Sequence, residues 1–156
     1  MKDRHLTSLG SRADRGAGTN GTAMAAADSA VVEAIIAACA LVALANDLVV
    51  TRERQYLIRL ICGNPALAEQ SPAQIEKEFA MQSRLLFANP AAGRQRALRL
   101  IAEIAERSDM ARIVLNACLL MTQADGQVTR QEIAAIKDIR NALKLDPRPV
   151  RPPLQR

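Results

Sequence analysis

The chain has 156 residues, 49% of them hydrophobic, and a formal net charge of +5. This length suits one domain with a hydrophobic core, and the only aromatic residues are Tyr56, Phe79 and Phe87. Alanine, leucine and isoleucine must therefore fill the core, which favours closely packed helices over a sheet. Residues 29–145 hold 14 basic and 12 acidic residues, a near balance that argues against a dedicated nucleic-acid binder.

The first 28 residues are predicted to be a disordered leader. Residues 1–23 are rich in Gly, Ser and Arg and contain His5, the only histidine, in a polar context that suits neither a metal ligand nor a catalytic base. Met24 resembles a natural start, so the preceding stretch is interpreted as a leader, a cloning remnant or an over-extended start. No signal peptide or membrane-spanning run is recognisable, which predicts a cytoplasmic protein.

Four helices are expected in the first two thirds of the chain. The first runs from Asp28 or Ser29 to Ala45, with one apolar stripe made of Val32, Ile35, Ile36, Cys39, Val42 and Ala43. The second covers residues 52–61 and ends before Gly63 and Pro65. The third begins at Ser71-Pro72-Ala73-Gln74, a capping box, and ends near Phe87, and the fourth covers residues 91–107.

Two more helices and a tail complete the chain. A fifth helix begins at Ser108 or Asp109. A sixth begins with a second capping box, in which Thr129 is the N-cap and the Glu132 side chain is expected to accept a hydrogen bond from the Thr129 backbone amide. The sixth helix ends near Leu143. Residues 146–156 are rich in Pro and Arg and are expected to be extended. The three cysteines lack zinc-ligand spacing, so we expect small, buried, reduced thiols.

A helix–loop–helix pattern occurs twice, over residues 35–53 and 114–132. Six aligned positions are identical, namely Ala38/Ala117, Cys39/Cys118, Leu41/Leu120, Ala45/Ala124, Val49/Val128 and Glu53/Glu132. The repeat predicts an all-α fold, a compact bundle of about six to seven helices built from two related helical halves.

The second loop contains the chemistry that could bind a cation. Asp125-Gly126 and Glu132 match the second half of a calcium loop, in which glycine allows a sharp turn and the final Glu offers two oxygens. Met121 and Gln123 stand where the first acidic ligands would be, so an EF-hand is excluded. Val128 is expected to anchor the loop to the core. A tight turn followed by a helix cap explains the same residues without a metal.

The first loop keeps less of this pattern. Asn46 replaces the acidic residue, Asp47 replaces the glycine, and Glu53 is retained. If the two halves pack about a pseudo-twofold axis, Asp47, Glu53, Asp125 and Glu132 meet at one edge and form a metal site. Without that convergence, the sequence predicts no metal site.

The duplicated helix–ADG-x-V-x-x-x-E–helix resembles the TerB-like family, which is associated with tellurite resistance and related to the N-terminal module of the DjlA co-chaperones. The resemblance covers about residues 29–146, including the segment 108–132 and the closing segment 139–147, where Lys144 occupies a position at which the family often has glycine. It implies a compact helical domain with acidic loop residues that bind a divalent metal. Asp125, Glu132 and Glu53 match the motif, whereas Asn46 departs from it.

The implied function is that of a non-enzymatic, cytoplasmic stress-response sensor or scaffold. Its cofactor would be a divalent cation (Ca, Mg, Mn or Zn), and its partners would be proteins, a membrane protein among the options. Two alternatives remain open: a protein-binding adaptor without metal, and a helical nucleic-acid binder that uses Arg94, Arg96 and Arg99. A hydrolase is disfavoured because no Ser–His or Cys–His pair and no phosphate-binding glycine loop is present. The sequence leaves the oligomeric state open.

Overall fold

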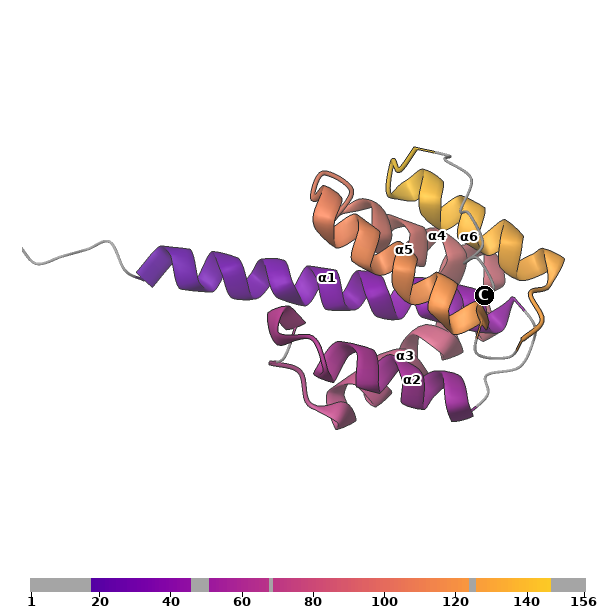
Figure 1. Cartoon of the computed structure of the whole chain (residues 1–156), viewed down its shortest axis with the longest axis horizontal. Coiled ribbons are helices and arrows are strands. Elements are labelled where there is room, and N and C mark those ends of the chain that lie inside the picture. Colours follow the sequence, from indigo (N-terminus) through magenta and orange to yellow (C-terminus); the bar gives the residue numbers. More distant parts are fainter. Residues whose placement is uncertain (1–17, 46–50, 68, 124–125, 147–156) are drawn as a thin grey trace, which may run out of the picture.

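The computed structural model describes residues 18–45, 51–67, 69–123 and 126–146 (Figure 1). Within these ranges the chain forms helices and no strand. The helices are α1 Gly18–Leu44, α2 Thr51–Cys62, the 3-10 turn η1 Pro65–Leu67, α3 Pro72–Ala88, α4 Pro90–Ala102, α5 Ser108–Gln123 and α6 Arg130–Ala142. The prediction of a compact all-α bundle is confirmed.

Helix α1 is the centre of the bundle. In Figure 1, α2 and α3 lie on one side of it and α4, α5 and α6 on the other. All its side chains from Val31 to Val42 except Glu33 are buried, so the expected single apolar stripe is wrong. Because the segment is apolar all round and rich in alanine, neighbouring helices can pack closely against every face of it.

Helix α1 also begins earlier than predicted. It starts at Gly18 rather than at Asp28 or Ser29, so residues 18–28 are part of the helix. Alanine is the best helix former, and residues 23 and 25–27 are alanines, which explains the extension. Residues 1–17, with His5, lie outside the described part of the chain.

Helix α4 ends earlier than predicted. It stops at Ala102, and residues up to Arg107 form successive turns, with hydrogen bonds from Ile104 N to Ile101 O and from Arg107 N to Ile104 O. Ile104 is 1% exposed, so the turns bring it into the core. Helix propensity alone predicts that the helix continues to residue 107. Burial of the Ile104 side chain favours the turns instead.

Several predicted helix ends are confirmed. Both capping boxes are present: Ser71 with Gln74 at α3 and Thr129 with Glu132 at α6. After α6, Lys144 adopts a φ of 52°, the left-handed conformation for which glycine is favoured. A non-glycine residue is therefore strained at the position where the family often has glycine.

The two predicted repeats adopt the same local order of helix, connection and helix, as α1–α2 and α5–α6. Cys39 and Cys118 are both buried, on α1 and α5, whereas Cys62 is only partly buried, and the three cysteines are unpaired as expected. The pseudo-twofold relation between the two halves stays a prediction.

Candidate functional site

Glu53 and Glu132, the described members of the candidate cation site, lie in the first turns of α2 and α6, at one end of the bundle. The C-terminal ends of α1 and α5 and the N-terminal ends of α2 and α6 all point to this end (Figure 1). The helix ends that flank the two connections therefore lie on the same side of the bundle. Asp47 and Asp125 belong to these connections but lie outside the described residues.

Glu132 occupies the first turn of α6 and is 1% exposed. Its Oε2 accepts hydrogen bonds from the Thr129 backbone N–H at 2.7 Å and from the Thr129 hydroxyl at 3.1 Å. The Thr129 Oγ1 in turn accepts from the Glu132 backbone N–H at 3.2 Å. The capping box thus engages Oε2 and leaves Oε1 as the oxygen of this carboxylate that is not part of the box.

Glu53 occupies the corresponding first turn of α2 and is 3% exposed. It lies on the same helix face as Leu57 and Ile61, which are buried in the core. Burial of an ionised carboxylate is costly unless charge or hydrogen bonds compensate. Two buried glutamates therefore lie at matching positions of two helices at this end.

The structure confirms the prediction for Gly126 and contradicts the prediction for Val128. Gly126 has a φ of 72°, so glycine makes the predicted sharp turn. Val128, however, is 47% exposed and does not anchor the loop to the core. The prediction for Val128 is wrong because the capping box, whose members are local in sequence, already fixes the start of α6.

The described residues alone do not form a metal site. Among them, no group of three or more His, Cys, Asp or Glu side chains is close enough to hold an ion. A hard cation takes about six to eight oxygen ligands, so Glu53 and Glu132 need the carboxylates of Asp47 and Asp125, local carbonyls or water. The donors are all oxygens, which fits Ca²⁺, Mg²⁺ or Mn²⁺ better than Zn²⁺.

The basic stretch on α4 lies at the surface of the molecule. Arg94, Arg96 and Arg99 all reach solvent, and Arg94 forms an ion pair with Asp138 of α6. One of the three charges is therefore used in holding α4 to α6.

Sequence inspection missed two buried polar features. Gln82 is 1% exposed, and its Nε2 donates to Glu78 Oε1 at 3.0 Å. Its position in the series Ile75, Phe79, Gln82, Leu86 could have revealed this burial. The second feature is a hydrogen bond between the thiols of Cys39 and Cys118, which together with burial raises the pKa of Cys118 well above that of an ordinary thiol.

The fold and this end of the bundle define a helical module with two buried acidic residues at matching helix starts. A family model described as tellurite resistance protein TerB matches residues 32–151, and the chain therefore belongs to the TerB family. No curated protein sequence and no solved structure gives a significant match. Among the described residues, none of the helices combines the length and hydrophobicity needed to cross a membrane.

Proposed function

We propose that this chain is a non-enzymatic TerB-family module that binds a divalent cation with Asp47, Glu53, Asp125 and Glu132. In this proposal it acts in the cytoplasm as a stress-response sensor or scaffold, of the kind needed for tellurite resistance, and its partners are proteins. The family membership supports the type of module. The cation, the sensing role and the partners go beyond that membership.

The observation that supports the proposal is the burial of Glu53 and Glu132 at 3% and 1% exposure. Both lie at the end of the bundle where the connections carrying Asp47 and Asp125 emerge. Their carboxylates would supply oxygen ligands to a cation bound between the connections. Such a cation would connect the first turns of α2 and α6, two helices that do not contact each other directly in the described part of the chain.

A non-enzymatic role is supported by the side chains available. The only histidine is His5, far from the loops in sequence, and no glycine-rich loop suited to phosphate binding occurs. The two glutamates are buried rather than presented to a substrate in an open cleft. Binding and positioning therefore describe this chemistry better than turnover.

The test is a thermal melt of the chelated protein with and without Ca²⁺, Mg²⁺, Mn²⁺ and Zn²⁺. At an ion concentration of 100 Kd, binding to the folded state alone adds about 2.7 kcal/mol, which is roughly a 10 °C rise in Tm for a domain of this size. We expect this rise with one of the oxygen-preferring ions, and its loss in Asp125→Asn and Glu53→Gln. Asp109→Asn, an exposed position at the start of α5, is the matched control and should retain it.

Equal cation-induced shifts in Tm for the wild type and for Asp125→Asn would refute a cation site that contains Asp125. No shift with any ion would favour the second candidate, a protein-binding adaptor without metal. That candidate is supported by the capping box, which gives Glu132 a structural role of its own. The nucleic-acid alternative is weaker, because the ion pair with Asp138 engages Arg94.

A further inference from the structure

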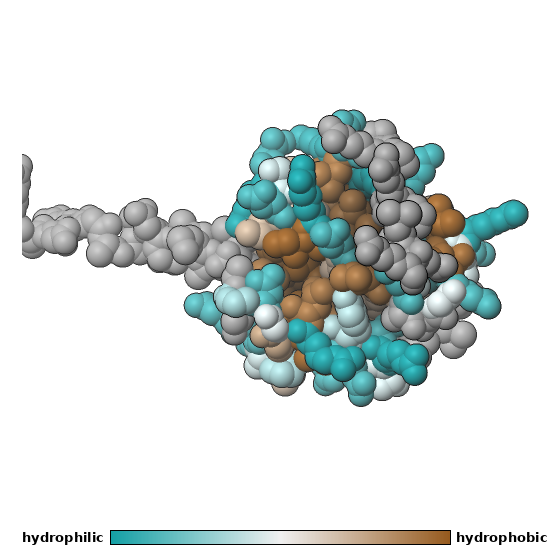
Figure 2. All heavy atoms as spheres, in the orientation of Figure 1, coloured by the Kyte–Doolittle hydropathy of each residue, from teal (hydrophilic) through white to brown (hydrophobic). Residues whose placement is uncertain are grey.

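A second surface of the molecule has the shape of a binding site and lies away from the cation site. Helices α2 and α5 flank α1 (Figure 1). A groove of about 510 Å³ lies between them. Leu60 of α2 and Ile113 and Leu120 of α5 line it. Figure 2 shows hydrophobic side chains gathered in this hollow between two hydrophilic ridges.

The groove is open because both helices turn other faces to the core. The buried residues of α2 are Glu53, Leu57 and Ile61, whereas Leu60 lies on the next face and is half-buried. On α5, Leu120 is 45% exposed. A single exposed leucine needs no explanation, but three aliphatic side chains lining one hollow are typical of a binding surface.

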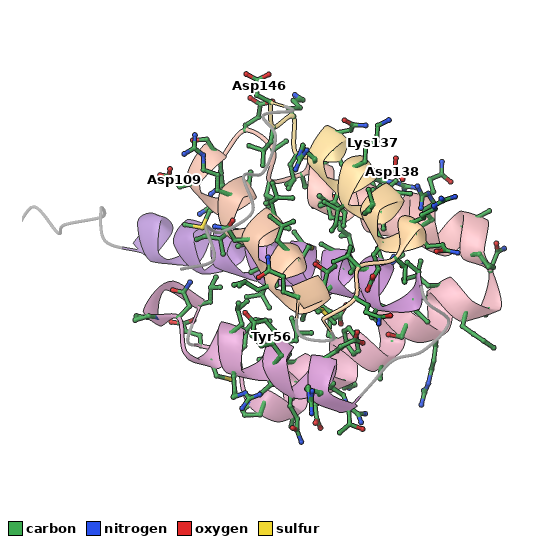
Figure 3. All side chains as sticks on the ribbon, turned by 45° about the vertical axis from the view of Figure 1, so that its right-hand side comes forward. Tyr56, Asp109, Lys137, Asp138 and Asp146 are labelled. Carbon is green, nitrogen blue, oxygen red and sulfur yellow. The ribbon has the colours of Figure 1, made fainter. Side chains whose placement is uncertain are left out.

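Arg59 of α2 lines this groove, and Arg52 lies on the same face of α2, outside the residues that line the groove. Arg52 and Arg59 are exposed at spacings of four and three from Tyr56, so these three residues lie along one edge of α2 (Figure 3 labels Tyr56). Within the described part of the chain, neither arginine forms an ion pair. The α5 edge contributes the neutral amide of Asn116 at the groove. An occupant with acidic side chains along one edge would complement this charge.

We propose that the groove binds an amphipathic helix of a partner protein, with aliphatic side chains directed into the groove and Asp or Glu facing Arg52 and Arg59. Helix α2 has 12 residues and is therefore about 18 Å long, which a partner helix of three turns would cover. Insertion of an apolar helix face into a groove between helices is a recurring mode of recognition.

The chain's own C-terminal segment is a poorer occupant. Residues 147–156 contain three arginines and no acidic residue, so they would place positive charge against Arg52 and Arg59. Their four prolines also disfavour a helix. Charge and helix propensity therefore both favour a separate, acidic partner. The inference does not depend on the proposed cation.

The experiment measures fluorescence anisotropy of three labelled peptides titrated with the full-length, chelated protein at low salt. The first is a designed amphipathic helix with Leu at positions i, i+3, i+4 and i+7 and Glu on its flanks. The second carries Lys in place of Glu, and the third is the tail sequence DPRPVRPPLQR. We expect saturable binding of the Glu peptide and about tenfold weaker binding of the Lys peptide, with a difference that shrinks as salt is added.

Variants locate the binding to the groove. Leu120→Glu should abolish binding of the Glu peptide, and Arg59→Glu should weaken it several-fold while improving binding of the Lys peptide. Phe87→Glu is the matched control, because Phe87 is 83% exposed on α3 and lies outside the groove. Circular dichroism confirms that each variant is folded.

Three outcomes would overturn the proposal. The first is the absence of saturable binding of the Glu peptide to the folded wild type. The second is a Leu120→Glu variant that binds as the wild type does, or a Phe87→Glu variant that alone loses binding. The third is competition by the tail peptide at equal concentration, which would make the tail the occupant.

Discussion

The close approach of α4 to α3 depends on Gly93, and Gly93→Ala is the most direct test of the packing. Gly93 is buried, and a Cβ added there would lie 2.7 Å from the Leu86 Cα and 2.9 Å from the Leu85 O and the Leu86 N. Carbon atoms normally approach to about 3.5–4.0 Å, so the shortfall is roughly 1 Å. All three neighbours are backbone atoms and cannot rotate away, so the helices themselves must separate.

The expected cost exceeds the gain from helix propensity. Alanine is more favourable than glycine in a helix by about 0.8–1.0 kcal/mol. Forcing a methyl group into a packed interface costs typically 1–3 kcal/mol, and a separation approaching 1 Å also forfeits a quarter to a half of the neighbouring van der Waals contacts. Because Ala97 and Ile101 of the same helix are fully buried, those contacts are numerous. We expect a net destabilisation of about 2–3 kcal/mol.

The assay is urea unfolding followed by circular dichroism at 222 nm, with the free energy obtained by linear extrapolation. The pair Arg96→Ala and Arg96→Gly, at an exposed position of α4, measures helix propensity alone and should favour alanine. If Gly93→Ala were as stable as the wild type, or more stable, α4 would not approach α3 as closely as the structure indicates, and the reasoning would be refuted.

Three further predictions concern helix ends and the thiols. Lys144→Gly should raise stability by about 0.5–1 kcal/mol in thermal melts, because it relieves the left-handed strain at a φ of 52° and loses only an exposed ion pair with Glu106. Thr129→Ala should lower stability by about 1–2 kcal/mol, since it removes the cap and a hydrogen bond to buried Glu132; an unchanged Tm would contradict this. Cys118→Ser should destabilise through a buried hydroxyl, with Cys39→Ser acting in the same direction. The raised pKa of Cys118 means that the folded state retains a proton that the unfolded state loses, so stability should fall as the pH rises above about 9, and Cys118→Ala should reduce that fall in urea titrations.

Local sequence rules predicted the starts of α3 and α6, because the interactions that define these two helix ends are local. Ser71 with Gln74 and Thr129 with Glu132 are three residues apart, and their hydrogen bonds form within one turn. The end of α4 was missed because burial of Ile104 depends on helices distant in sequence. The burial of α1 on all sides has the same origin, since periodicity describes one helix and not the number of neighbours around it.

The candidate site was predictable in part. The repeat singled out Glu53 and Glu132, and the structure shows both buried in the first turns of α2 and α6. The groove was not predictable, because Leu60, Ile113 and Leu120 belong to ordinary apolar periodicities on two helices. Only the relative position of α2 and α5 turns these three residues into one surface.

Helix α2 connects the two proposed surfaces. Its first turn directs Glu53 into the bundle, while Arg59, nearer its C-terminal end, lines the groove. A cation held through Glu53 would fix this turn and thereby the position of the positive edge that faces a partner helix. Each surface can nevertheless fail alone: peptide binding by the chelated protein tests the groove without the cation, and the melting shift tests the cation without a peptide. If both succeed, a rigid α2 provides the physical path by which cation occupancy would alter partner binding, and the same coupling energy would then act in the reverse direction.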